Sequence, residues 1–187
     1  MKGMVFTEFL EMVEDTFGWE IAEDIVEESN LPSGGAYTSV GTYDHKEMVT
    51  MVVALSEKTG LDIPTLLKAY GKHLFGRFST LYGTFFEGVS GTFDFLKSID
   101  QYIHVEVRKL YPDAELPKFD YEYPNDETLV MIYSSKRPFA DFAEGLLMGC
   151  LEHFGESIEI HREDLNEANG TEAKFTLVKV PESVAAD

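Results

Sequence analysis

The sequence predicts an α+β domain with a mostly helical N-terminal lobe and a C-terminal lobe of antiparallel strands with a helix. Apolar residues recur at helical spacing through most of the first half of the chain. From Phe119 onward, stretches rich in β-branched and aromatic residues alternate with polar ones. No repeat divides the chain. We therefore expect one domain over residues 1–180, with lobes of about 1–62 and 63–180, and a flexible tail over 181–187.

The composition is that of a folded protein with a strongly acidic surface. Of 187 residues, 44% are hydrophobic and 13% aromatic, which is enough for a sizeable core. The formal net charge of −19 argues against nucleic acid and anionic membranes as partners. The single cysteine, Cys150, excludes an intramolecular disulfide. We find neither a membrane span nor a secretory signal, so we expect a cytoplasmic protein.

The first two helices are predicted from amphipathic spacing. Residues 4–17 place apolar side chains on one side, and Gly18 is suited to end this helix. A second helix is expected over residues 19–28, followed by a loop at residues 31–35 because that segment contains proline and two glycines.

Two aspartates are suited to start the next two helices. Asp44 is a predicted N-cap, with Glu47 three residues later as in a capping box, and its helix runs toward Gly60. Asp62 is the second predicted cap, and Pro64 fits the first turn of the helix that follows.

A helix around His104 leads into the strands. We expect it to end at Tyr111, because the proline that follows disfavours helix in the residue before it. Strands over 119–123 and 128–134 form a hairpin with its turn at 124–126.

The rest of the chain is predicted to form one helix and a second hairpin. Pro138 opens the helix and Gly155 ends it. Strands over 157–162 and 174–180 follow, with a turn at 169–170.

The candidate site combines a helical histidine with three polar residues. Apolar neighbours at helical spacing place His104 at the edge of a buried helix face. If the second strand continues to Arg137, then Tyr133, Ser135 and Arg137 point the same way. Two hydroxyls and a guanidinium suit a flat anion with two carboxylates. The histidine can supply an axial ligand to a metal in the same molecule, and haem meets both requirements.

These residues resemble those of the haem–nitric oxide/oxygen binding (H-NOX) family, the sensor domains of soluble guanylate cyclase and its bacterial relatives. Pro117, between the histidine and the tyrosine, and the start Met1-Lys-Gly resemble that family too. The resemblance extends to about residue 180. It implies haem b between a distal and a proximal lobe, with His104 as the iron ligand. It also implies that Pro117 presses on the porphyrin and helps distort it.

The resemblance further implies an apolar distal pocket. It places these side chains over the distal face of the haem: Val5, Phe9, Leu74, Phe78, Phe142 and Leu146. Family members that hold dioxygen stably have a tyrosine at the position of Phe142. Bound dioxygen gains from such a donor, whereas nitric oxide binds tightly without one. We therefore expect a ferrous haem that binds nitric oxide and carbon monoxide and forms no durable oxygen complex.

The implied function is sensing, without enzymatic activity. Nitric oxide bound opposite His104 would weaken the iron–histidine bond, and the His104 helix and the two lobes would then move. The sequence contains no recognisable output domain, so we expect a separate effector, either a histidine kinase or a cyclic-di-GMP enzyme. The alternatives are an oxygen or redox sensor, a haem enzyme, and a haem-free scaffold whose polar row faces water.

Three further residues have secondary interpretations. Asp100 lies one helical turn before His104 and can accept a hydrogen bond that orients the ring. His73 is a possible sixth ligand, although we expect it to face solvent beside Lys72. Cys150 is expected to be a buried apolar side chain. The remaining histidines show no spacing typical of a metal site: His45, His153 and His161.

Overall fold

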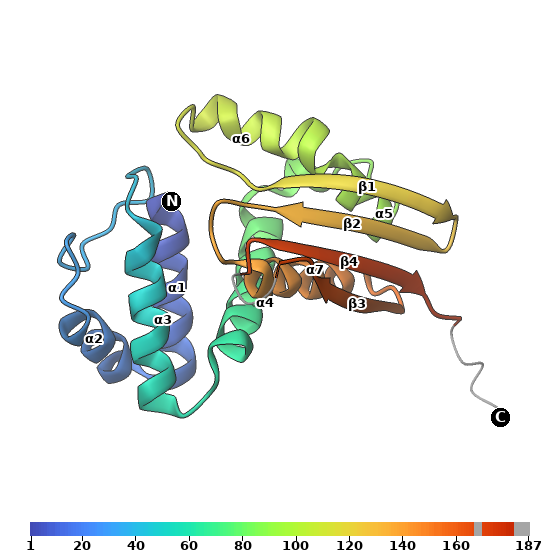
Figure 1. Cartoon of the computed structure of the whole chain (residues 1–187). Coiled ribbons are helices and arrows are strands. Elements are labelled where there is room, and N and C mark those ends of the chain that lie inside the picture. Colours follow the sequence, from blue (N-terminus) through green and yellow to red (C-terminus); the bar gives the residue numbers. More distant parts are fainter. Residues whose placement is uncertain (167–169, 182–187) are drawn as a thin grey trace.

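The computed structural model describes residues 1–166 and 170–181 and confirms the α+β class (Figure 1). A helical lobe lies on one side, and a four-stranded antiparallel sheet packed against helices lies on the other. The predicted tail beyond Pro181, and Asn169 of the predicted turn, lie outside the described residues. Within those residues, no helix is long and apolar enough to cross a membrane.

The helices of the first half of the chain confirm the sequence pattern: α1 Gly3–Phe17, α2 Trp19–Glu28, α3 His45–Thr59 and α4 Ile63–Leu81. Both predicted caps are present. Asp44 accepts from the amide of Lys46 at 3.0 Å and Asp62 accepts from that of Thr65 at 2.7 Å.

The predicted capping box at α3 is wrong. Glu47 is buried, and its carboxylate accepts from the hydroxyls of Ser33 at 2.5 Å and Tyr37 at 2.9 Å. A buried carboxylate needs strong donors, and the loop before α3 supplies them. Glu47 therefore ties that loop to the helix.

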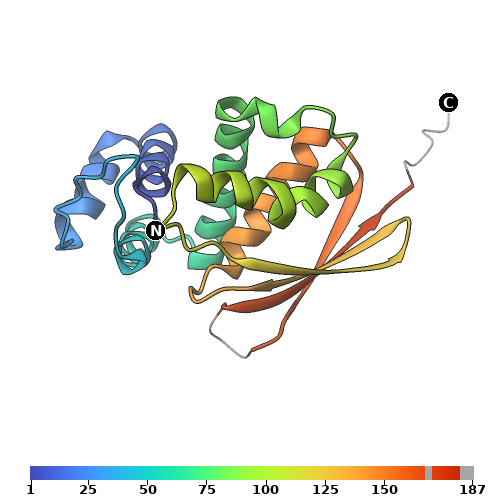
Figure 2. The same cartoon turned by 90° about the horizontal axis from the view of Figure 1, so that it is seen from above.

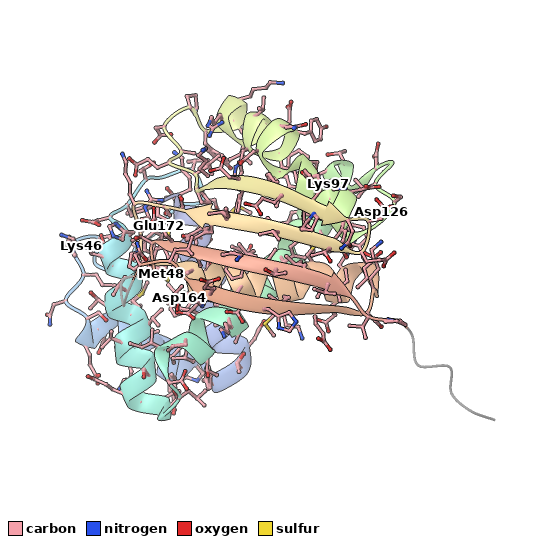
Figure 3. The ribbon with its side chains drawn as sticks, turned by 45° about the vertical axis from the view of Figure 1, so that its right-hand side comes forward. Lys46, Met48, Lys97, Asp126, Asp164 and Glu172 are labelled. Atoms are coloured by element: carbon pink, nitrogen blue, oxygen red, sulfur yellow. The ribbon has the colours of Figure 1, made fainter. Side chains whose placement is uncertain are left out.

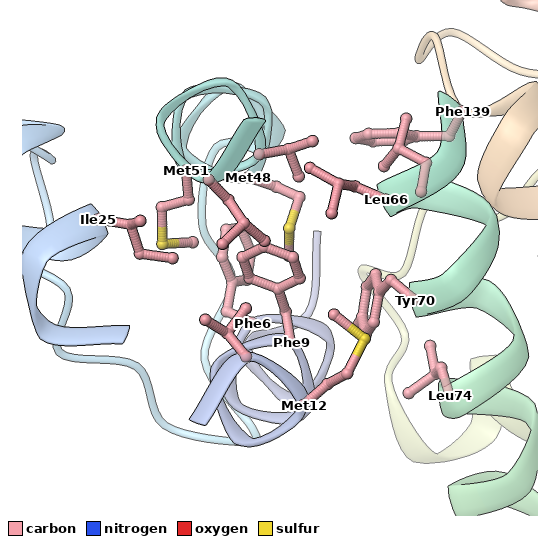
Figure 4. Close-up of a cluster of buried hydrophobic side chains, with 14 of the residues drawn as sticks. Phe6, Phe9, Met12, Ile25, Met48, Met51, Leu66, Tyr70, Leu74 and Phe139 are labelled. Atoms are coloured by element: carbon pink, nitrogen blue, oxygen red, sulfur yellow. The ribbon is translucent and has the colours of Figure 1, made fainter. Parts of the chain in front are cut away.

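The N-terminal core is a cluster of aromatic rings and methionines between α1, α3 and α4 (Figure 4). Phe6 and Phe9 of α1 lie toward Met48 and Met51 of α3, and Met12 of α1 points toward Tyr70 of α4. None of the described residues of this core lies in the sheet, so its stability depends on side-chain packing and not on a backbone ladder.

The second half of the chain contains short helices and the sheet. Its elements are η1 Gly83–Phe86, α5 Thr92–Ser98, the π-helical turn η2 Ile99–Ile103, α6 His104–Leu110, β1 Lys118–Asn125, β2 Thr128–Ser134, α7 Ala140–Phe154, β3 Ile158–Asp164 and β4 Glu172–Lys179. The strand order is β1-β2-β4-β3. Helices α4 to α7 lie on one face of the sheet (Figure 2). Figure 3 looks onto the other face, which no helix of the described chain covers.

One predicted strand end is wrong. β1 continues to Asn125, which pairs with Thr128 after a break in register beyond Glu122, so the turn lies at 126–127 and not at 124–126. A bulge accommodates Pro124, which has no N–H for the ladder. β2 has the predicted bounds, Thr128–Ser134, and the condition that it continue to Arg137 is not met.

Helices α4 and α7 cross with their backbones in contact, and this crossing joins the two lobes. A Cβ on Gly71 would lie 2.2 Å from the carbonyl oxygen of Phe142, and one on Gly145 would lie 2.2 Å from that of Lys68. Helix α4 gives Tyr70 to the N-terminal core and Phe75 to the second core beneath the sheet. The predicted lobe boundary at residue 62 stays a prediction.

Candidate functional site

A cavity of about 660 Å³ lies between the N-terminal helices and the sheet lobe. Its walls are mostly apolar and aromatic. They include these predicted site residues: Val5, Leu74, Phe78, His104, Pro117, Tyr133, Ser135, Arg137, Phe142 and Leu146. The structure thus brings one helical imidazole, one polar trio and one apolar wall to the same cavity.

Phe9 is the exception, because it does not line the cavity. It is fully buried in the N-terminal core, with its ring edge against Tyr70 at a centroid distance of 5.2 Å. Tyr70 in turn lies 5.1 Å from the ring of Phe142, which does line the cavity. Phe9 therefore supports the wall from behind, because Tyr70 of α4 inserts between it and Phe142.

His104 is held by a chain of hydrogen bonds that begins in the helix and ends in the sheet. It is the first residue of α6 and follows the π-helical turn η2, in which its amide donates to the carbonyl of Ile99. Its Nδ1 lies 2.6 Å from Oδ1 of Asp100. The other oxygen of Asp100 accepts from the amide of Phe119 on β1 at 2.9 Å. Helical spacing left open whether Asp100 and His104 touch; in the structure they do, and β1 fixes Asp100.

The electrostatics of this pair favour a neutral imidazole. Burial lowers the pKa of His104, and the hydrogen bond and charge of Asp100 oppose that shift only in part. A carboxylate can only accept, so Nδ1 carries the proton and Nε2 keeps its lone pair. This is the tautomer in which histidine ligates a metal through Nε2.

Tyr133, Ser135 and Arg137 meet at the cavity for a reason other than the predicted one. The strand ends before Ser135, so alternation along β2 does not align the three side chains. A turn does so instead, because the amide of Arg137 donates to Oγ of Ser135 at 3.1 Å. Burial raises the pKa of Tyr133, and the Ser135 hydrogen bond and the charge of Arg137 oppose that shift.

The guanidinium of Arg137 is already bound to a carboxylate. It donates to Oε2 of Glu115 at 2.7 Å and to the carbonyl of Glu115 at 3.0 Å. Sequence reasoning missed Glu115, whose pairing across 22 residues has no local signal. The contact shows that the fork of Arg137 can hold a carboxylate beside the cavity.

The segment after α6 is fastened to the N-terminal lobe by a cluster that we call the Asp113 latch, made of Lys2, Thr42 and Asp113. The ammonium of Lys2 lies 2.6 Å from the Asp113 carboxylate, which also accepts from the hydroxyl of Thr42 at 2.7 Å. The same ammonium lies 5.2 Å from the ring centre of Tyr111. These contacts connect the C-terminal end of α6, the helix that begins with His104, to the N-terminal lobe. Sequence reasoning missed this cluster too.

His73 and Cys150 lie outside the cavity lining. We expected His73 to face solvent, but its Nε2 is buried. This atom has no hydrogen-bond partner in the described part of the chain. Cys150 is fully buried, as predicted, and burial raises the pKa of its thiol. A thiol of this kind is unreactive.

The residues present fit a haem. The cavity offers apolar walls, a neutral imidazole with Nε2 available, and a guanidinium fork with two hydroxyls for carboxylates. These features are those of a haem-binding domain. The chain belongs to the Haem-NO-binding family, whose model matches residues 2–162.

Solved structures of H-NOX proteins are similar to this chain over nearly its whole length. The Fe(II) unliganded protein from K. algicida is 43% identical, covers 100% of both chains and has a TM-score of 0.92. The IWP-051-bound protein from Shewanella woodyi, in its Fe(II)CO state, is 43% identical over 100% of this chain and 97% of its own, with a TM-score of 0.84. The S. oneidensis protein in its Fe(II)NO state is 25% identical over 96% and 99%, with a TM-score of 0.88. The comparison with curated proteins gives no match.

Proposed function

We propose that this protein is a nitric oxide sensor that holds haem b with His104 as the proximal iron ligand. The observation that carries the proposal is the bond between Asp100 and Nδ1 of His104, which fixes an imidazole that lines a mostly apolar cavity. When bound, the haem iron supplies the site at which a gas coordinates. Asp100 orients the imidazole, and Tyr133, Ser135 and Arg137 hold the haem carboxylates.

The opposite wall supports a preference for nitric oxide and carbon monoxide over dioxygen. None of its predicted residues, Val5, Leu74, Phe78, Phe142 or Leu146, carries a hydrogen-bond donor on its side chain. The hydroxyl of Tyr70 lies behind this wall and already donates to the carbonyl of Val5. The similar proteins from S. woodyi and S. oneidensis were solved with carbon monoxide and nitric oxide respectively.

The Asp113 latch supports transmission of a movement of α6 to the N-terminal lobe, since it joins the end of that helix to Lys2 and Thr42. We propose a regulatory role without catalysis, exerted on a separate histidine kinase or cyclic-di-GMP enzyme. The net charge of −19 would favour a basic surface on that partner. A cytoplasmic location stays a prediction.

The test is an absorbance spectrum of the purified, haem-loaded, reduced protein. We expect a Soret band that shifts with nitric oxide and shows no stable oxygenated form in air. A stable oxygenated spectrum would contradict the gas preference and identify an oxygen sensor. A protein that stays colourless with hemin would overturn haem binding itself.

The matching test of ligation is His104→Gly, which should lose haem unless imidazole is supplied. His161→Gly is the control, because His161 lies on β3 with 64% of its side chain exposed. Unchanged haem retention in His104→Gly would remove His104 from the proximal role.

A further inference from the structure

His45 lines the same cavity as Arg137 but belongs to the other lobe. It is the first residue of α3, and its Nδ1 lies 3.2 Å from Oδ1 of Asp44. Asp44 is itself fixed, because it caps α3 by accepting from the amide of Lys46. The imidazole meets the ring of Phe139 edge to face, at a centroid distance of 6.2 Å. His45 is therefore a positioned side chain of the cavity, 29% exposed.

The charges facing His45 come from three parts of the chain. Asp44 and Lys46 flank it on its own helix. Arg137, paired with Glu115, approaches from the segment before α7, and the amino group of Met1 approaches from the N-terminus. Burial lowers the pKa of His45, Asp44 opposes this, and Arg137, the amino group and Lys46 lower it further.

This end of the cavity thus has more positive groups than carboxylates. Lys46, Arg137 and the Met1 amino group outnumber Asp44 and Glu115, in a chain whose net charge is −19. The amino group donates to the carbonyl of Tyr43 at 2.7 Å, which leaves its charge without a carboxylate partner among the described residues. An anion that enters here supplies the missing negative charge.

We propose that His45 is a second carboxylate-binding residue for the haem and that it takes up a proton from solvent when the haem binds. This inference rests on the haem binding proposed above. A carboxylate beside the imidazole stabilises the imidazolium, so haem binding and protonation of His45 favour one another. The carboxylates of one haem would then be held by Arg137 from the sheet lobe and by His45 from the helical lobe. The haem itself would link the lobes at this end, as the Asp113 latch does through protein groups.

The test is an equilibrium titration of the purified apoprotein with hemin at several pH values from about 6 to 8, the range in which histidine titrates. The wild-type affinity should rise as pH falls, by up to about 10-fold if binding shifts the pKa by about one unit. His45→Gln should bind more weakly at low pH and lose this rise. His45→Lys should keep high affinity without the rise, because its charge is permanent. His161→Gln should behave as the wild type.

Two further measurements separate a carboxylate contact from a structural role of His45. Hemin dimethyl ester, which lacks free carboxylates, should bind the wild type without the rise at low pH. Zinc protoporphyrin is a diamagnetic probe for NMR, and it should raise the measured pKa of the His45 imidazole. An unchanged pKa, or a wild-type pH dependence in His45→Gln, would overturn the role of His45 and leave haem binding standing. Failure of the wild type to bind hemin would overturn both proposals.

Discussion

Two walls of the cavity, one with His104 and the other with Phe142, differ in how their polar atoms are arranged. On the first wall, a polar chain runs from the imidazole through Asp100 to the amide of Phe119, so that one ring nitrogen has a fixed position. On the second wall, the nearby hydroxyl of Tyr70 is turned away and bonded to a backbone carbonyl. One wall positions an atom, whereas the predicted residues of the other carry no polar side-chain atom. Changes in the first should alter cofactor binding, and changes in the second should alter which gas binds.

Among changes that keep His104, the largest effect is expected from Asp100→Ala, which removes the polar support of the first wall. It deprives the imidazole of its orienting acceptor and leaves the amide of Phe119 without its partner. We expect the affinity for haem to fall by about 10- to 100-fold, as for other residues that orient a histidine ligand. Hemin titration measures the affinity, and the iron–histidine stretching frequency in the resonance Raman spectrum should fall as well.

Two comparisons sharpen this result. Asp100→Asn keeps an acceptor oxygen but loses the charge, so it should fall between the wild type and Asp100→Ala. Asp120→Ala is the control, because this exposed carboxylate on β1 pairs only with Lys118 among the described residues. Wild-type affinity and stretching frequency in Asp100→Ala would show that the first wall does not depend on its polar chain.

Phe142→Tyr tests the second wall by adding a donor that its predicted residues lack. The new hydroxyl would enter a cavity lined by apolar side chains, where a donor to bound dioxygen is worth about 1 kcal/mol, or roughly 5- to 10-fold in affinity. Oxygen titration of the reduced protein, followed by absorbance, measures the change. Phe154→Tyr on the same helix is the control, because Phe154 is not among the cavity-lining residues. An oxygen affinity that is equal in both variants would show that donor placement at residue 142 does not set gas preference.

The features that sequence reasoning predicted are those that depend on near neighbours. The caps at Asp44 and Asp62 follow from side chains that reach amides two or three residues away. The pair of Asp100 and His104 follows from one turn of helix, although whether the two touch required the structure. Pattern alone would place Phe142 in an ordinary core, and only the family resemblance assigned it to the cavity.

The features that sequence reasoning missed depend on contacts between segments that are distant in the sequence. Helical spacing puts Val5 and Phe9 on one face of α1, but the insertion of Tyr70 from α4 decides which of them reaches the cavity. The carboxylate that Arg137 holds, Glu115, lies 22 residues away, and Thr42 and Asp113 are 71 residues apart. Residue spacing determines which way a side chain points along its own element. Residue spacing does not determine which other element packs against that side chain.

The smallest effect is expected from Asp113→Asn, at the point where the segment after α6 meets the N-terminal lobe. The contacts with Lys2 and Thr42 lower the pKa of Asp113 from 3.8 to about 2. A depressed carboxyl pKa contributes stability that is complete above the ordinary value and disappears as pH falls through the lowered one. The variant should therefore have a slightly lower thermal midpoint from neutral pH down to about pH 4, and the difference should vanish toward about pH 2.

Thermal unfolding followed by circular dichroism at each pH measures this difference, with Asp126→Asn in the exposed β1–β2 turn as the control. The effect should be small because 58% of the Asp113 side chain is exposed to solvent. A difference in thermal midpoint that persists at the lowest pH would show that the Asp113 latch is stabilised by packing and hydrogen bonding and not by the charge of Asp113. In that case the two lobes would be joined at this end by the shape of the loop after Tyr111. The electrostatic link between them would then be confined to the end of the cavity that carries Arg137 and His45.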